Sequence, residues 1–258
     1  MKRPLILVTN DDGISAPGLR NLIRIMNDFG DVFVVAPDGP QSGMGHAITI
    51  EATIRCDKII IEEGPQIEYS CSGTPVDCVK LAVNQLLNRK PDLCVSGINH
   101  GSNSSINVIY SGTMSAAVEG ALEGIPSIGF SLLDFSHNAD FSEAEKYIRK
   151  ITKSVLKNGI DSGVCLNVNI PKHIDGESIQ GIKVCRQANA NWEEEFEERK
   201  DPKGRTYYWL TGKFVNYDKG TDTDEWALSN HYVSVVPVQF DVTAHHSISK
   251  LNKTISDE

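Results

Sequence analysis

The chain has 258 residues, enough for one large domain or two small ones. Acidic residues outnumber basic ones by 34 to 25, a formal net charge of −9, and no cluster of Lys and Arg occurs. This charge balance argues against a protein that binds duplex DNA. Hydrophobic residues make up 40% of the chain without forming a run of about 18, which favours a globular protein over disordered, collagen-like or transmembrane classes.

Neither the N-terminus nor the cysteines indicate export. The apolar stretch after the basic start breaks at Thr9-Asn10-Asp11-Asp12, too soon for a signal peptide. The six cysteines form no Cys-x-x-Cys motif and no zinc-finger spacing. We therefore expect a cytoplasmic protein whose thiols are reduced and mostly buried.

Strands and helices are expected to alternate through the first two thirds of the chain. Buried strands are predicted at residues 5–9, 32–36, 93–96, 126–131 and 164–168. Helices are predicted at residues 17–28, 75–88, 113–123 and 142–156, with Thr74 and Ser142 as N-caps. The alternation predicts an α/β fold, a Rossmann-like doubly wound sheet that is mostly parallel.

The character of the sequence changes after about residue 170. Strands are predicted at 182–186 and 233–237, and a short helix from His246. Segments 192–199 and 205–211 flank the turn sequence Lys200-Asp201-Pro202-Lys203-Gly204 and predict a long β-hairpin arm. We expect a single domain over 1–258, with its core at about 1–181 and the arm and C-terminal segment at about 182–258.

Three strand-end loops carry hard oxygen donors. They are Asn10-Asp11-Asp12-Gly13, Pro40-Gln41-Ser42-Gly43 and Gly97-Ile98-Asn99-His100-Gly101. The ends of parallel strands meet at one sheet edge, so these loops should lie close together. Two carboxylates, a hydroxyl and an amide carbonyl suit Mg²⁺, Mn²⁺ or Ca²⁺. His100 lies in the same region and is a candidate proton donor.

A fourth loop, Tyr110-Ser111-Gly112-Thr113, leads directly into a helix of small residues. Free backbone N–H groups and the positive end of the helix dipole suit phosphate, and the Ser111 and Thr113 hydroxyls could add hydrogen bonds. Simple helix capping is the alternative. A metal loop beside an anion pocket favours metal-assisted hydrolysis of a phosphoester.

Other nucleotide and hydrolase motifs are absent from the sequence. No Gly-x-Gly-x-x-Gly follows the first strand, and neither a P-loop nor a Gly-x-Ser-x-Gly elbow occurs. Asp222-Thr223-Asp224-Glu225 lacks the Gly and distal Glu of a calcium loop, so a structural role is expected for it.

At its four loops the chain resembles the SurE family of survival-protein nucleotidases over nearly its whole length. The resemblance is carried by motifs that occur in the family's order: Val8-Thr9-Asn10-Asp11-Asp12-Gly13, Ala16-Pro17-Gly18, Ala36-Pro37, Gln41-Ser42-Gly43, Gly73-Thr74-Pro75-Val76-Asp77-Cys78-Val79, Ser96-Gly97-Ile98-Asn99-x-Gly101, Tyr110-Ser111-Gly112-Thr113, Tyr232-Val233-Ser234-Val235 and Asp241-Val242-Thr243. Where the family often continues Leu-Gly-x-Asp after Asn103, this chain has Ser104-Ser105-Ile106-Asn107, a departure that concerns substrate preference.

The resemblance implies a phosphatase that acts on nucleoside 5′- and 3′-monophosphates, and in some members on polyphosphate. It implies one divalent cation per subunit, Mg²⁺ or Mn²⁺, with Asp11, Asp12, Ser42 and Asn99 as ligands. It also implies a homodimer or homotetramer that exchanges the C-terminal arm. No duplex nucleic acid and no membrane is expected as a partner.

In the expected mechanism, the cation polarises a phosphate oxygen and lowers the pKa of a water that attacks phosphorus in line. Asp11, Asp12 and Asn99 are the expected catalytic residues, and one of the carboxylates could act as base. Asn103, Ser111, Gly112 and Thr113 are expected to hold the phosphate. A covalent aspartyl-phosphate is a competing route. Two other classes remain open: a haloacid-dehalogenase-type phosphatase, which would want Asp-x-Asp, and a non-catalytic nucleotide-binding stress protein.

Overall fold

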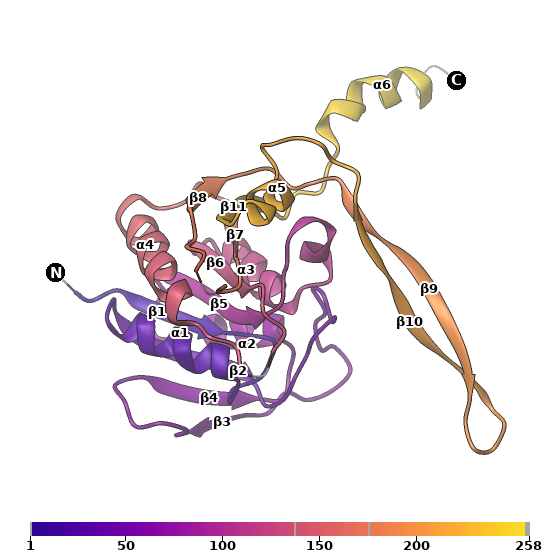
Figure 1. Cartoon of the computed structure of the whole chain (residues 1–258). Coiled ribbons are helices and arrows are strands. Elements are labelled where there is room, and N and C mark those ends of the chain that lie inside the picture. Colours follow the sequence, from indigo (N-terminus) through magenta and orange to yellow (C-terminus); the bar gives the residue numbers. More distant parts are fainter. Residues whose placement is uncertain (1, 137, 175, 256–258) are drawn as a thin grey trace.

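A nine-stranded β-sheet forms the centre of the protein (Figure 1). The structure is a computed structural model and describes residues 2–136, 138–174 and 176–255. The strands lie in the order β3-β4-β2-β1-β5-β6-β7-β11-β8. Their bounds are β1 Leu5–Thr9, β2 Asp31–Pro37, β3 Cys56–Ile59, β4 Ile67–Cys71, β5 Leu93–His100, β6 Ser127–Leu132, β7 Val164–Ile170, β8 Gly181–Val184 and β11 Tyr232–Gln239.

Most neighbouring strands of the sheet are parallel, and the exceptions lie toward its two edges. The run from β4 to β7 is parallel throughout, whereas β3 is antiparallel to β4 and β11 is antiparallel to β7. The C-terminal strands β8 and β11 thus complete the main sheet. The predicted α/β fold with a mostly parallel sheet is confirmed.

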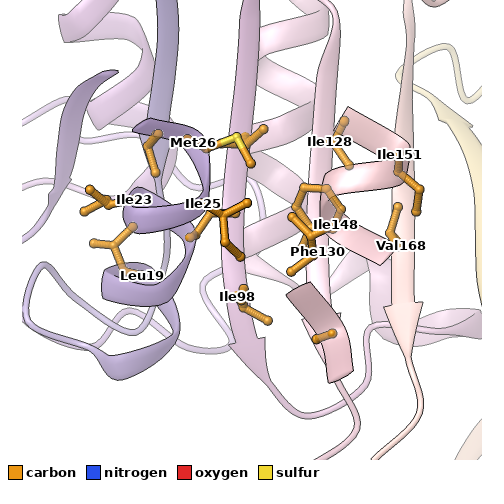
Figure 2. Close-up of a cluster of buried hydrophobic side chains, with 14 of the residues drawn as sticks. Leu19, Ile23, Ile25, Met26, Ile98, Ile128, Phe130, Ile148, Ile151 and Val168 are labelled. Carbon is orange, nitrogen blue, oxygen red and sulfur yellow. The ribbon is translucent and has the colours of Figure 1, made fainter. Parts of the chain in front are cut away.

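Helices cover both faces of the sheet. Apolar residues of α1 (Pro17–Asn27) and α4 (Ser142–Asn158) pack with one face, as Figure 2 shows for Leu19, Met26 and Ile148. Residues of α2 (Pro75–Leu81) and α3 (Gly112–Leu122) pack on the other. Successive residues of β1 enter opposite layers, because a central parallel strand is buried on both sides.

The element boundaries follow the sequence predictions closely, with two differences. The predicted strand at 93–96 continues to His100 as β5. The predicted helix at 75–88 is an α-helix only to Leu81 and continues as a π-helical turn, Ala82–Leu86. Thr74 caps this helix as predicted: its hydroxyl accepts from the Asp77 N–H at 3.1 Å, and Asp77 accepts from the Thr74 N–H at 2.9 Å.

The capping role predicted for Ser142 is wrong. The cap position is Phe141, and Ser142 is the first residue of α4. Its N–H donates to the Asp140 carboxylate at 2.9 Å, and its hydroxyl donates to the same carboxylate at 3.0 Å. The Ser142 hydroxyl therefore bonds to Asp140, two residues before it, and not to a backbone N–H of the helix as the sequence pattern predicted.

A long antiparallel hairpin projects from the body of the protein (Figure 1). It consists of β9 (Ala190–Lys200) and β10 (Thr206–Asn216), as the sequence predicted. The short helix α5 (Asp224–Ser229) follows it, and α6 (His245–Ile255) ends the described chain. Five arm aromatics are exposed: Trp192, Phe196, Tyr207, Tyr208 and Trp209.

The cysteines behave as expected for packing residues. All six are free; five are buried and Cys56 is half-buried. Burial raises the pKa of the Cys94 and Cys165 thiols to about 12. No helix within the described residues is long and apolar enough to span a membrane.

Candidate active site

The three acidic and polar loops converge at one edge of the sheet. Strands β1 and β5 are parallel neighbours with Thr9 opposite Ser96, so Asp11 and Asn99 follow at the same edge. The Gln41 N–H donates to the Asp11 backbone carbonyl at 2.7 Å, which brings the Pro40–Gly43 loop to the same place. The convergence expected from the strand ends is confirmed.

Asp11 is a buried carboxylate that faces the start of α3. Its side chain is only 4% exposed, and Oδ1 accepts a hydrogen bond from the Thr113 hydroxyl. A Cβ at Gly112 would lie 2.6 Å from the Asp11 Cβ, so this position needs glycine for the approach. Burial raises the pKa of Asp11 to about 6; the Thr113 bond opposes the rise, and the neighbouring Asp12 charge adds to it.

Asp12 lies beside His100 in a cleft of about 430 Å³. Its Oδ2 accepts from the His100 backbone N–H at 3.4 Å. Burial raises the pKa of Asp12 too, although the His100 ring and N–H oppose the rise. The His100 Nδ1 lies 3.0 Å from the Ser136 carbonyl, which assigns the proton to Nδ1. Its Nε2 is buried and bonds to no described residue.

The side chains of Ser42 and Asn99 differ in exposure and in hydrogen bonding. Ser42 is exposed in the turn after Gln41. Asn99 is half-buried, and its Nδ2 donates to the Gly101 carbonyl at 2.9 Å. That bond orients the amide and leaves Oδ1 without a donor among the described residues.

The donor set fits a hard divalent cation. Neither Asp11 nor Asp12 forms a salt bridge with any described residue. Their negative charges are therefore not balanced by a protein cation, and burial raises the pKa of both carboxyls. Uncompensated carboxylates beside a hydroxyl and an amide oxygen are the ligands that Mg²⁺ and Mn²⁺ take. Within the described ranges no three His, Cys, Asp or Glu side chains gather as a metal cluster. A cation here would therefore depend on the Ser42 and Asn99 oxygens as well.

The side chains expected to hold phosphate have protein partners. The Ser111 hydroxyl caps α3 by accepting from the Met114 N–H at 3.0 Å. The Thr113 hydroxyl donates to Asp11, and the Asn103 amide donates to the Ser131 hydroxyl at 2.9 Å. The first backbone N–H groups of α3, those of Gly112 and Thr113, have no partner within the helix. The Thr113 N–H hydrogen-bonds to Asp11 and opposes the rise of its pKa, so the Gly112 N–H is the donor that no described residue uses.

An amide network that the sequence reading missed holds the Asn103 loop. Asn169 Oδ1 accepts from the Asn103 N–H at 2.8 Å, and Asn167 Nδ2 donates to the Asn103 carbonyl at 2.8 Å. Asn169 Nδ2 also donates to Asn167 Oδ1 at 2.9 Å. Both asparagines are buried on β7. The sequence signal that could have predicted this network is the pair Asn167 and Asn169, two amides at alternate positions of an otherwise apolar strand.

A second missed contact ties the Ser42-bearing loop to α3. Glu119 is buried on α3 and accepts from Lys80 Nζ at 2.7 Å and lies 2.8 Å from His46 Nε2. Burial alone would raise the pKa of Glu119, but the His46 and Lys80 contacts outweigh it and lower the pKa. His46, four residues after Ser42, therefore anchors this loop to Glu119 of α3.

The sequence Asp222-Thr223-Asp224-Glu225 has the structural role that was expected. Thr223 caps α5 by accepting from the Trp226 N–H at 3.1 Å. Asp222 pairs with Arg186 at 2.9 Å, and Asp224 accepts from the backbone N–H groups of Ser105 and Ala188.

Comparisons with known proteins identify the family of this chain. Residues 6–194 match the family model described as survival protein SurE. The chain is 70% identical over 252 residues to 5′-nucleotidase SurE of Christiangramia forsetii, covering 97% of this chain and 96% of that protein. It is 68% identical to the protein of the same name from Flavobacterium psychrophilum, covering 98% of each.

A solved structure extends the match to the fold. The SurE protein of Aquifex aeolicus superposes with a TM-score of 0.83 at 39% identity, covering 97% of this chain and 99% of that one. The matched family segment contains every residue of the loop cluster at the sheet edge. The chain belongs to the SurE family.

Proposed function

We propose that this chain is a divalent-metal-dependent phosphomonoesterase that releases inorganic phosphate from nucleoside 5′- and 3′-monophosphates, with polyphosphate as a further substrate. Its relatives bear the name 5′-nucleotidase SurE. The observation that carries the proposal is the burial of Asp11 against the start of α3. A carboxylate without a cationic partner there faces a helix end that attracts anions.

Asp11, Asp12, Ser42 and Asn99 are the residues that would hold one Mg²⁺ or Mn²⁺. When bound, such a cation would polarise a phosphate oxygen and make a water more acidic. The Thr113 hydroxyl and the Gly101 carbonyl orient Asp11 and Asn99 for this role. One carboxylate of the Asp11–Asp12 pair takes a proton from the attacking water as the water oxygen bonds to phosphorus. The bond from phosphorus to the nucleoside oxygen breaks, and that oxygen takes up a proton, so that nucleoside and inorganic phosphate are released.

The phosphate is held by the backbone at the start of α3. The N–H group of Gly112 binds a non-bridging oxygen, at the helix end whose dipole favours negative charge. The missing side chain at Gly112 keeps this path open beside Asp11. Asn103 acts by fixing the loop, because its amide is bound to Ser131.

The test is phosphate release from a panel of nucleotides before and after chelation. EDTA should abolish release, and Mg²⁺ or Mn²⁺ should restore it. Asp12→Asn should lose at least 10–100-fold in turnover, while Asp161→Asn, which changes an exposed carboxylate, should not. Full phosphate release in a verified metal-free preparation would refute the proposed metal dependence.

The same assay separates the other classes. Nucleotide binding without phosphate release would mark a non-catalytic module. Radiolabelled phosphate retained on acid-quenched protein would mark the aspartyl-phosphate route, including a haloacid-dehalogenase-type reaction, in place of direct attack by water.

The β9–β10 arm is the proposed subunit contact. Four aromatic side chains along the outer part of the arm are exposed on a two-stranded ribbon that projects from the body: Phe196, Tyr207, Tyr208 and Trp209. An apolar surface of this kind marks an interface. The protein assembles as a homodimer or homotetramer in which the arm reaches a neighbouring subunit.

A further inference from the structure

A second hollow, of about 420 Å³, lies between the β5–α3 loop and the root of the arm. It shares the Phe135 ring with the cleft that contains Asp12 and His100, so the two spaces adjoin at that residue. Its volume lies in the range of small-molecule pockets. Its lining includes Ser102, Ser104 and Asn107 of the loop, Trp192 and Phe214 of the arm, and Glu225 of α5.

Two aromatic rings form one wall of this hollow. Trp192 and Phe214 are directly opposite each other on β9 and β10, and their ring centroids lie 5.6 Å apart at an interplanar angle of 63°. The Trp192 Nε1–H donates to Asn107 Oδ1 at 2.8 Å. Trp192 nevertheless remains 41% exposed. An aromatic ring that is fixed in position and still accessible offers a stacking surface.

A carboxylate forms the polar part of the lining. Glu225 is half-buried, and its Oε1 accepts a hydrogen bond from the buried Ser104 hydroxyl. No described residue donates to Oε2, and no described cation pairs with Glu225. The carboxylate is thus oriented by Ser104 with one oxygen free to accept from a ligand.

We infer that this hollow binds the nucleobase of the substrate, which stacks against the Trp192–Phe214 wall while Glu225 accepts a hydrogen bond from an exocyclic amino group. The inference rests on the proposed function and adds its base specificity. Adenine and cytosine carry an amino group where hypoxanthine and uracil, respectively, carry an oxo group, and we expect the two amino bases to be preferred.

Charge and connectivity favour this occupant. The acidic Glu225 disfavours phosphate in the hollow, whereas the start of α3 favours it, so a nucleotide has one orientation across the two sites. One loop joins these places: it begins after His100, forms the hollow at Ser104 and Asn107, and ends at Ser111. Base–aromatic stacking also tolerates different bases, which leaves discrimination to Glu225.

The stacking part is tested with Phe214→Leu. The ratio of kcat/KM for AMP to that for ribose 5-phosphate, which lacks the base, should fall on the order of 10-fold or more. Phe196→Leu, which changes an exposed aromatic farther along the same arm, should leave the ratio unchanged. An equal fall in both variants, or none in Phe214→Leu, would overturn the inference.

The specificity part is tested with Glu225→Gln on the AMP/IMP and CMP/UMP pairs. The wild type should favour the amino base about 10-fold, the effect of a hydrogen bond to a charged group. The variant should favour it less than about 3-fold, because a glutamine amide can either accept or donate. Its carbonyl can still accept from Ser104, so the fold is retained. An unchanged preference would refute the role of Glu225.

Binding distinguishes this inference from the proposed function. Calorimetry with AMP and Mg²⁺ should show weaker binding for Phe214→Leu than for the wild type, even if the wild type releases no phosphate. That result would refute the phosphatase and retain the base site. If the wild type releases phosphate but binds AMP no more tightly than Phe214→Leu, the phosphatase would stand and the base site would be refuted. The aromatic wall would then be assigned to contact with a second copy of the chain.

Discussion

Replacing Asp11 by Asn should stabilise the metal-free protein while inactivating it. The folded chain raises the pKa of this carboxyl from 3.8 to about 6, chiefly by burial. A difference of about 2 pKa units corresponds to about 3 kcal/mol of differential interaction. Ionised Asp11 therefore costs the folded state up to about 3 kcal/mol at neutral pH, a cost that Asn, which carries no charge, avoids. The Asn carbonyl can still accept the Thr113 hydroxyl bond.

The pH dependence gives the sign of the effect. Between about pH 4 and pH 6 the folded state binds more protons at Asp11 than the unfolded state, so the wild-type free energy of unfolding falls as pH rises. Below about pH 4 both states are protonated, and the wild type and Asp11→Asn should unfold alike. The gap should open through this window and stay constant above about pH 6.

Urea unfolding followed by circular dichroism, in EDTA at pH 4 and pH 8, measures this gap. Asp161→Asn serves as the control for losing an exposed acid. Added Mn²⁺ should stabilise the wild type by mass action and Asp11→Asn much less. A variant that is no more stable than the wild type at pH 8, or a gap that is the same at both pH values, would refute the reasoning.

Three further predictions follow from single contacts. Thr113→Val should weaken Mn²⁺ binding about 10–100-fold by calorimetry, because the hydroxyl orients Asp11; a fall in kcat/KM at native metal affinity would instead make Thr113 a phosphate ligand. Glu119→Gln should lower the free energy of unfolding by about 1–3 kcal/mol at pH 7. Because the folded pKa of Glu119 is lowered, its contribution is present above the unfolded pKa and lost as pH falls through the folded value, so wild type and variant should converge in acid denaturation. Deleting residues 191–212 should give monomers by light scattering; an unchanged oligomer would place the subunit contact elsewhere.

Local sequence was sufficient for most elements and for the loops of the site. Buried strands of four to eight apolar residues and helices with 3.6-residue periodicity are visible without any partner. Asp11 and Asp12 could be placed at a strand end, and Thr74 at a helix start, from their immediate neighbours. Ser142 shows where this fails: its hydroxyl could accept from a backbone N–H of the helix or donate to Asp140, and the pattern could not rank these two equally local partners.

Which side chains meet was decided by the tertiary structure. Thr113 and Asp11 are 102 residues apart, and Ser104 and Glu225 are 121 apart. The sequence gives each hydroxyl a choice of partners, such as a helix end, a phosphate or a carboxylate. Only the packing of α3 against the end of β1, made possible by Gly112, directs Thr113 to Asp11. Contacts of this length depend on strand order and helix placement, which arise from burial of the whole core and not from any one segment.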